Sequence, residues 1–237
     1  MSGRATKLAL WTILPVGGCL AAALFGPPLA ARLMGGGYYA VPSGSMLPGL
    51  LPGDRVVGWA PDGMPARGSV VAFRRPDGAE QIARVIALPD EQVAVSGGVL
   101  AIDGVPATMV QLEDRVVRFE RYGTPPRLPR CAPPRPAPGG PCVQQRWRET
   151  LPGGATHTVL NVDGVLGETG GGAAADDLAP VVVPPAHLFV MGDHRDNAVD
   201  SRFAALGPVP LASLSAELAF VHFALGDGGL RFLEAVE

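Results

Sequence analysis

The sequence predicts a mainly β protein with one N-terminal transmembrane helix. Glycine occurs 32 times and proline 25 times among 237 residues, and this composition favours turns and short strands over long helices. Short β-branched or apolar runs recur after residue 54, separated by Gly, Pro and Asp, as in a protein built from strands. Residues 8–31 (LALWTILPVGGCLAAALFGPPLAA) contain no charge, which indicates a membrane segment.

The charge-free stretch is long enough to cross a bilayer. A helix over residues 8–25 would span roughly 27 Å, close to the hydrocarbon thickness of about 30 Å, and Pro27 and Pro28 would end it. Arg4 and Lys7 precede it, which places the N-terminus in the cytoplasm and the rest of the chain outside. A retained anchor is the favoured interpretation. The alternative is a cleaved signal peptide, because "PLAA" offers small residues for cleavage.

The part after the anchor is expected to form strands at 55–60, 69–74, 81–88 and 187–191. Residues 92–104 predict a hairpin, because two alternating runs flank a Gly-Gly pair. Residues 216–225 fit a strand or a helix equally well, since their period does not decide between the two.

Two irregular stretches indicate an insertion in the β core. Residues 121–141 are rich in proline, and residues 164–180 are rich in glycine and alanine. We therefore predict a cytoplasmic stub with the anchor at 1–34, a β core in two parts at 35–104 and 181–237, and an inserted β subdomain at 105–180.

Charge and cysteine usage exclude some classes of partner. A net charge of −3 and a pI near 5.8 argue against nucleic acid. Cys131 and Cys142 flank a proline-rich loop, and an oxidising compartment would join them in a disulfide; two free thiols are the alternative. No further Cys or His pair has the spacing of metal ligands, so neither a metal nor another cofactor is expected.

Four motifs follow the apolar stretch. They are PSGSMLPGLLPGD at 42–54, RGSVVAFRRP at 67–76, ARVIALPDEQV at 83–93 and MGDHRDNAVDSR at 191–202. In this order after an anchor, they resemble bacterial signal peptidase I, a membrane-anchored serine peptidase that removes signal peptides. The resemblance implies a fold of coiled antiparallel β-sheets.

The resemblance also implies roles for individual residues. Ser45 stands at the position of the nucleophile. Ser43 stands where a hydroxyl helps to bind the oxyanion together with the N–H of Ser45, since such donors must point to where negative charge develops. The positions that line apolar pockets for the small residues at −1 and −3 of a signal peptide are Tyr39, Val41, Pro42, Leu50 and Ile82. The positions that support the site are Arg84, Gly192, Asp193, Asp200, Ser201 and Arg202, with Asp200 and Arg202 as an ion pair.

One position departs from the family in a way that affects the chemistry. Ala83 replaces the general-base lysine, whose pKa must fall from about 10.4 to about 7–8 for it to accept the serine proton. Ala198 replaces the serine that hydrogen-bonds this lysine. Arg84 cannot substitute, because it is always protonated and faces the opposite way on a strand. The only lysine of the chain, Lys7, precedes the anchor. His194 is the candidate substitute base, although a lone histidine more often makes a structural hydrogen bond.

The implied function is that of a serine endopeptidase that cleaves signal peptides from exported pre-proteins, with activity in doubt at position 83. Its expected partners are signal peptides, membrane lipid and the secretion machinery, at the outer face of the cytoplasmic membrane with a single-pass anchor. Two alternatives stay open: an impaired pseudoenzyme that binds exported segments, and a maturation peptidase for one dedicated substrate.

Overall fold

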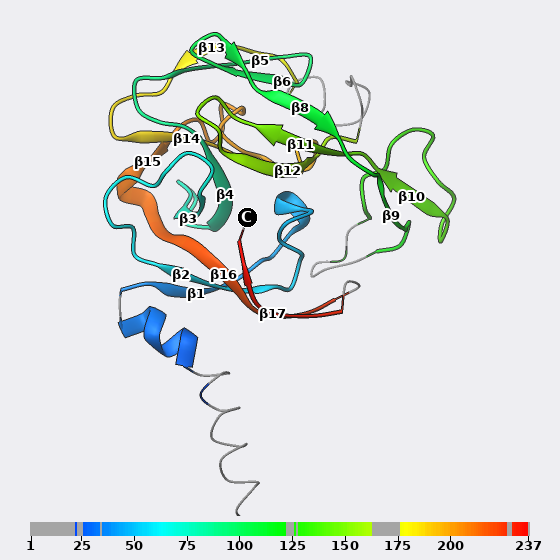
Figure 1. Cartoon of the computed structure of the whole chain (residues 1–237), viewed down its shortest axis with the longest axis horizontal. Coiled ribbons are helices and arrows are strands. Elements are labelled where there is room, and N and C mark those ends of the chain that lie inside the picture. Colours follow the sequence, from blue (N-terminus) through cyan, green and yellow to red (C-terminus); the bar gives the residue numbers. More distant parts are fainter. Residues whose placement is uncertain are drawn as a thin grey trace, which may run out of the picture.

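Antiparallel strands form nearly all of the regular structure in the computed structural model, which confirms the mainly β part of the predicted fold class. The structure describes residues 22, 26–33, 35–121, 126, 128–162, 176–226 and 229–236. Figure 1 shows that the strands gather into one large sheet, with smaller sheets stacked above it and to one side.

The largest sheet has eight strands in the order β1-β2-β16-β3-β4-β14-β15, with β17 paired to β16. Its strands are β1 (Gly37–Ala40), β2 (Arg55–Trp59), β3 (Val70–Arg74), β4 (Glu80–Ala87), β14 (His187–Met191), β15 (Val209–Pro210), β16 (Leu214–Gly226) and β17 (Gly229–Ala235). Two short 3₁₀ helices accompany them, η1 (Gly44–Met46) and η2 (Leu211–Ser213).

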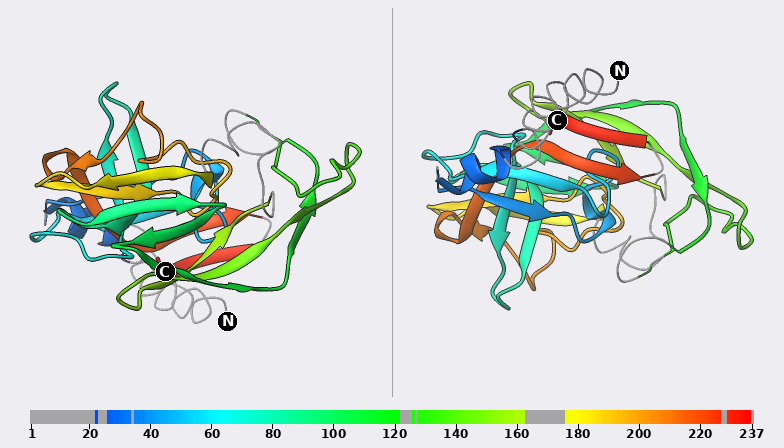
Figure 2. Two further views of the ribbon diagram at one scale, coloured as in Figure 1. Left: turned by 90° about the horizontal axis from the view of Figure 1, so that it is seen from above. Right: turned by 90° about the horizontal axis from the view of Figure 1, so that it is seen from below.

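Three smaller sheets come from the middle of the chain. The four-stranded sheet has the order β13-β5-β6-β7, the three-stranded sheet β12-β11-β8 and the two-stranded sheet β10-β9. These strands are β5 (Gln92–Ser96), β6 (Val99–Ile102), β7 (Val105–Pro106), β8 (Thr108–Gln111), β9 (Arg115–Arg118), β10 (Pro141–Gln144), β11 (Arg146–Thr150), β12 (Thr156–Leu160) and β13 (Leu178–Val182). Seen from above and below, the β9–β10 region projects away from the large sheet (Figure 2).

The hairpin predicted at 92–104 is confirmed as β5 and β6. Gly97 and Gly98 form its turn with φ of 52° and 78°, a conformation that glycine adopts without steric penalty. The ambiguous segment 216–225 is part of a strand, β16, which pairs with β2, β3 and β17. Its pairing with β2 shifts register between Leu218 and Phe220 and again between Val221 and Phe223. These shifts break the alternation of side chains along the strand and obscure its period in the sequence.

β4 is the strand on which the hydrophobic core converges. From Ile82 onward its residues are all buried, so both faces of the strand are covered. Ile82 belongs to a cluster with Val41 and Leu50. Ile86 packs with residues of the four-stranded sheet, and Ala83 packs in a third cluster with residues of β3 and β14. A change on β4 therefore acts on every part of the core.

The predicted membrane helix lies almost entirely outside the described residues, which include only residue 22 of the stretch 8–25. Among the residues that are described, no helix is both long and apolar enough to cross a bilayer. Residues 26–33, which include Pro27 and Pro28, are helical. Residues 23–25 lie outside the described part of the chain, so the predicted end of the membrane helix at these prolines stays a prediction. The fixed φ of proline is itself helical, and proline is tolerated in the first turn of a helix.

The proposed insertion contributes to the core instead of standing apart from it. Ala107 and Leu151 pack in the same cluster as Phe189 of β14. The predicted disulfide is confirmed: Cys131 and Cys142 are joined with their Cα atoms 5.1 Å apart. The boundaries 105–180 stay a prediction.

Candidate active site

The turn that carries Ser45 is held by its own hydrogen bonds and by buried side chains. Ser43 is extended, with φ −147° and ψ 169°, and its hydroxyl caps η1. The Ser43 Oγ accepts a hydrogen bond from the Ser45 N–H at 3.4 Å and lies 3.2 Å from the Ser45 Oγ. Met46, Leu47 and Leu50 are each at most 2% exposed. Both serines stay partly accessible while the residues that follow anchor the turn.

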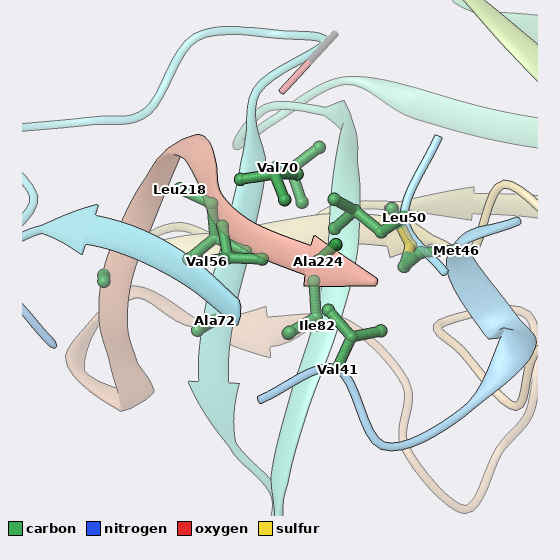
Figure 3. Close-up of a cluster of buried hydrophobic side chains, with 11 residues drawn as sticks. Val41, Met46, Leu50, Val56, Val70, Ala72, Ile82, Leu218 and Ala224 are labelled. Carbon is green, nitrogen blue, oxygen red and sulfur yellow. The ribbon is translucent and has the colours of Figure 1, made fainter. Parts of the chain in front are cut away.

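Most of the predicted pocket residues come together in one apolar cluster beside this turn. Val41, Leu50 and Ile82 are buried members, and Tyr39 packs against the cluster. Figure 3 shows Val41 and Ile82 side by side below Ala224, with Leu50 and Met46 to the right of Ala224. Pro42 is exposed at the start of the turn. Their role as substrate pockets stays a prediction.

The loop after β14 holds the backbone of Ser45. The His194 N–H donates to the Ser45 carbonyl oxygen at 3.0 Å. A side chain at Gly192 would collide with that same oxygen and with the Cβ of Ala198. Glycine at 192 is therefore required by close packing, and Ala198 lies next to the Ser45 turn.

Two buried ion pairs fix this loop. The Arg84 guanidinium donates to both carboxylate oxygens of Asp193, at 2.8 and 2.7 Å. Asp200 accepts from Arg202 and also from the Gly192 N–H at 3.0 Å. The hydroxyl of Ser201 accepts from the backbone N–H of Val190 at 3.0 Å. All the residues expected to support the site thus belong to one network around the loop.

Position 83 lies beside Ser45 but offers no proton acceptor. Met191 pairs with Arg84 in the β14–β4 ladder, so Gly192, one residue further, lies level with Ala83. Ala83 is fully buried among apolar neighbours that include Val71 and Val190. A lysine at this position would be desolvated, which favours its neutral form. The alanine present contributes only a methyl group.

His194 is not placed to act as a base for Ser45. Neither ring nitrogen has a hydrogen-bond partner within the described part of the chain. Complete burial, with the charges of Arg130 and Arg115, lowers the pKa of His194 to about 3. An imidazole with this pKa is a poor proton acceptor at neutral pH. Its backbone holds the Ser45 turn, whereas its side chain fills the protein interior.

One buried network in this region was not foreseen from the sequence. Arg195 forms a two-pronged ion pair with Glu149 of β11, and His157 of β12 lies 3.1 Å from the same carboxylate. Burial opposes the charge of Glu149, but Arg195 and His157 outweigh it and lower the pKa of this carboxyl to about 2. The three residues are far apart in the sequence, and no local motif marks them. The network ties the middle of the chain to the loop that holds Ser45.

Comparison with known families gives a clear match. The model of the family described as signal peptidase, peptidase S26, matches residues 16–223, which is most of the chain. A crystal structure of a signal peptidase I from Enterococcus faecalis V583 is 23% identical, and the alignment covers 65% of this chain and 97% of that chain with a TM-score of 0.33. At this TM-score the superposition carries no weight, and the assignment rests on the family match.

Proposed function

The chain belongs to the signal peptidase family, peptidase S26, and from that premise we propose that it recognises the signal peptides of exported pre-proteins. It holds the end of the signal peptide in the apolar groove beside Ser45. It cleaves the peptide only slowly, because position 83 carries a methyl group in place of the amine that would take the serine proton. The buried, apolar surroundings of Ala83 are the observation on which this proposal depends.

The groove supports peptide binding in two ways. β1 lies at the end of the large sheet and pairs only with β2 on the described path, so its other edge is free to add a strand. Val41 and Ile82 belong to the apolar cluster near that edge. An extended peptide with small side chains suits this arrangement, because alternate residues of an added strand point toward the apolar cluster.

The turn retains the parts needed to stabilise a tetrahedral intermediate. In the reaction, the Ser45 Oγ attacks the scissile carbonyl carbon, and the Ser45 N–H with the Ser43 hydroxyl donates to the oxygen that becomes negative. In the free protein, these groups bond each other, so peptide binding must redirect them. The serine proton then needs an acceptor, and loss of a placed base typically lowers the rate by about 10²–10⁴-fold.

The disulfide supports a location outside the cytoplasm. Disulfides persist in oxidising compartments and are rare in the cytosol, and Cys131–Cys142 is formed in this structure. We therefore place the β core at the outer face of the cytoplasmic membrane, where signal peptides present their cleavage sites. The apolar stretch 8–31 is the proposed anchor.

The test is a binding measurement that does not require turnover. The full chain in detergent micelles is titrated against a fluorescent peptide that ends in an Ala-x-Ala sequence, and anisotropy gives the Kd. We expect saturable binding that is unchanged by Ser45→Ala and weakened when the alanines are replaced by bulky residues. Absence of binding, or wild-type turnover in the usual enzymatic range of about 1–10³ s⁻¹, would contradict the proposal.

A further inference from the structure

A polar cavity lies beside the Ser45 turn, at the end opposite the apolar pockets. Its volume is about 320 Å³, at the lower end of the range of about 300–1,000 Å³ for ligand sites. Gly49 and Leu51, which follow Ser45 in the chain, form one wall, and Arg84 with Asp193 forms another. None of the roles implied by the resemblance accounts for a cavity at this place.

The cavity lies next to the apolar cluster along one strand. Ile82 and Arg84 stand two residues apart on β4, so their side chains lie on the same face of the strand. Ile82 belongs to the apolar cluster, and Arg84 lines the cavity. Pro48 and Gly49, three and four residues after Ser45, also line the cavity. A peptide with its scissile bond at Ser45 can therefore reach the cavity with the residues that follow the bond.

Among the residues that the structure describes, one arginine of the cavity has no acidic partner. Arg84 is paired with Asp193, and Arg231 of β17 is paired with Asp54 and Glu234. These ion pairs neutralise most of the charge of the side chains that line the cavity.

Arg146 of β11 is different. Its Nε donates to the backbone carbonyl of Glu113 at 2.6 Å, and across the described ranges its guanidinium forms no ion pair with a carboxylate. Thr158 lines the same cavity. An arginine in a recess, with its stem fixed by a backbone bond, presents the planar group that suits a carboxylate.

We propose that this cavity is a subsite for an acidic side chain among the first residues after the scissile bond, with Arg146 as the specificity-determining residue. The inference rests on the proposed function, because it requires a peptide in the adjoining groove. The ligand is a carboxylate of Asp or Glu within the mature part of the pre-protein. Arg146 donates hydrogen bonds to it, and Thr158 adds a further donor beside it.

The experiment compares matched peptides and matched variants by anisotropy in detergent micelles. One peptide ends at the Ala-x-Ala sequence. Two longer peptides extend a few residues beyond it and differ only by Glu or Gln at one position after the scissile bond. The comparison is repeated with the Glu or Gln at each of these positions in turn. The variants are Arg146→Gln and Arg148→Gln. Arg148 lies on the same strand but is exposed and does not line the cavity. Arg148→Gln therefore removes the same charge at a place outside the cavity.

At one mature position, we expect the peptide with Glu to bind with a Kd about tenfold lower than the peptide with Gln. This is the effect of one hydrogen bond between charged groups that is weakened by partial exposure to solvent. The preference should vanish in Arg146→Gln and persist in Arg148→Gln. The short peptide should bind all three proteins equally. Equal Kd values for the Glu and Gln peptides at every position, with the short peptide still bound, would overturn the subsite and leave the proposed function standing. Failure of the short peptide to bind wild type would overturn both.

Discussion

The turn around Ser45 and the strand position beside it have kept very different amounts of polar chemistry. The turn has two hydroxyl groups, a backbone N–H and a carbonyl oxygen held by the loop after β14. Position 83 has a buried methyl group in an apolar cluster. Ala198, whose Cβ lies next to Gly192, also offers only a methyl group. We propose that the first region binds a peptide carbonyl, whereas the methyl groups of the second offer no atom that accepts a proton.

This contrast indicates that recognition and proton transfer are separable in this fold. The ion pairs of Arg84 with Asp193 and of Arg202 with Asp200 still fix the loop, so the alanines have not loosened the backbone of the site. A buried lysine and its hydrogen-bonding partner form a unit, because a desolvated amine needs a polar neighbour. Loss of both members leaves a well-packed apolar region, whereas loss of one would leave a buried polar group unsatisfied.

The largest expected effect comes from restoring the missing chemistry. The double change Ala83→Lys with Ala198→Ser should raise the cleavage rate of an Ala-x-Ala peptide by about 10²–10⁴-fold, because the amine is held neutral by its apolar surroundings. Ala83→Met with Ala198→Ser is the matched control, since it adds similar bulk without a base. Equal rates in the two variants, measured by mass spectrometry of the products, would show that the rest of the site no longer supports catalysis.

The next effect concerns the support of the Ser45 turn. Glu149→Gln leaves the buried Arg195 without its counter-ion and should lower the free energy of unfolding by about 3–5 kcal/mol. Glu120→Gln is the control, because Glu120 pairs with Arg118 at the surface, where both side chains are more than half exposed, and such pairs contribute less than about 1 kcal/mol. Urea unfolding followed by tryptophan fluorescence measures both. Similar losses in the two variants would mean that the buried network does not hold the loop.

A smaller effect separates the backbone role of His194 from its side chain. The folded protein holds the pKa of His194 near 3, below its ordinary value of 6.5, so protons bind the unfolded chain more readily. Stability is therefore full above pH 6.5 and declines as the pH falls toward 3. Between about pH 7 and pH 5 this histidine should account for a loss of about 2 kcal/mol.

His194→Asn should abolish the loss of stability that comes from protonation of His194 in the unfolded chain. It should keep the hydrogen bond from the backbone N–H of residue 194 to the Ser45 carbonyl oxygen. Urea unfolding of wild type and variant at the two pH values measures it. An unchanged pH dependence in the variant would show that the imidazole is not held neutral in the fold.

Sequence patterns predicted the parts of the molecule that depend on local chemistry. The Gly97-Gly98 turn follows from backbone freedom, and the Cys131–Cys142 bridge follows from a short loop in an oxidising compartment. The turn at Ser45 was recognised from its motif, since the residues that shape it are contiguous. Pro27 and Pro28 lie within a helical segment, because the fixed φ of proline is also compatible with a helix.

Features made by distant segments were out of reach of the sequence. Glu149 meets Arg195 across 46 residues, and Arg231 meets Asp54 across 177. No periodicity or spacing records such pairs, because they depend on how the sheets stack. The cavity beside Arg146 was missed for the same reason.

The central claim is that Ser45 sits in a competent groove without a base, and a serine-directed fluorophosphonate probe tests it most directly. The full chain is incubated with the probe, and peptide mass spectrometry reads labelling at Ser45. We expect negligible labelling of wild type and clear labelling of the Ala83→Lys, Ala198→Ser protein under the same conditions. Rapid labelling of wild-type Ser45 would show that some group already takes its proton, and the account would be wrong.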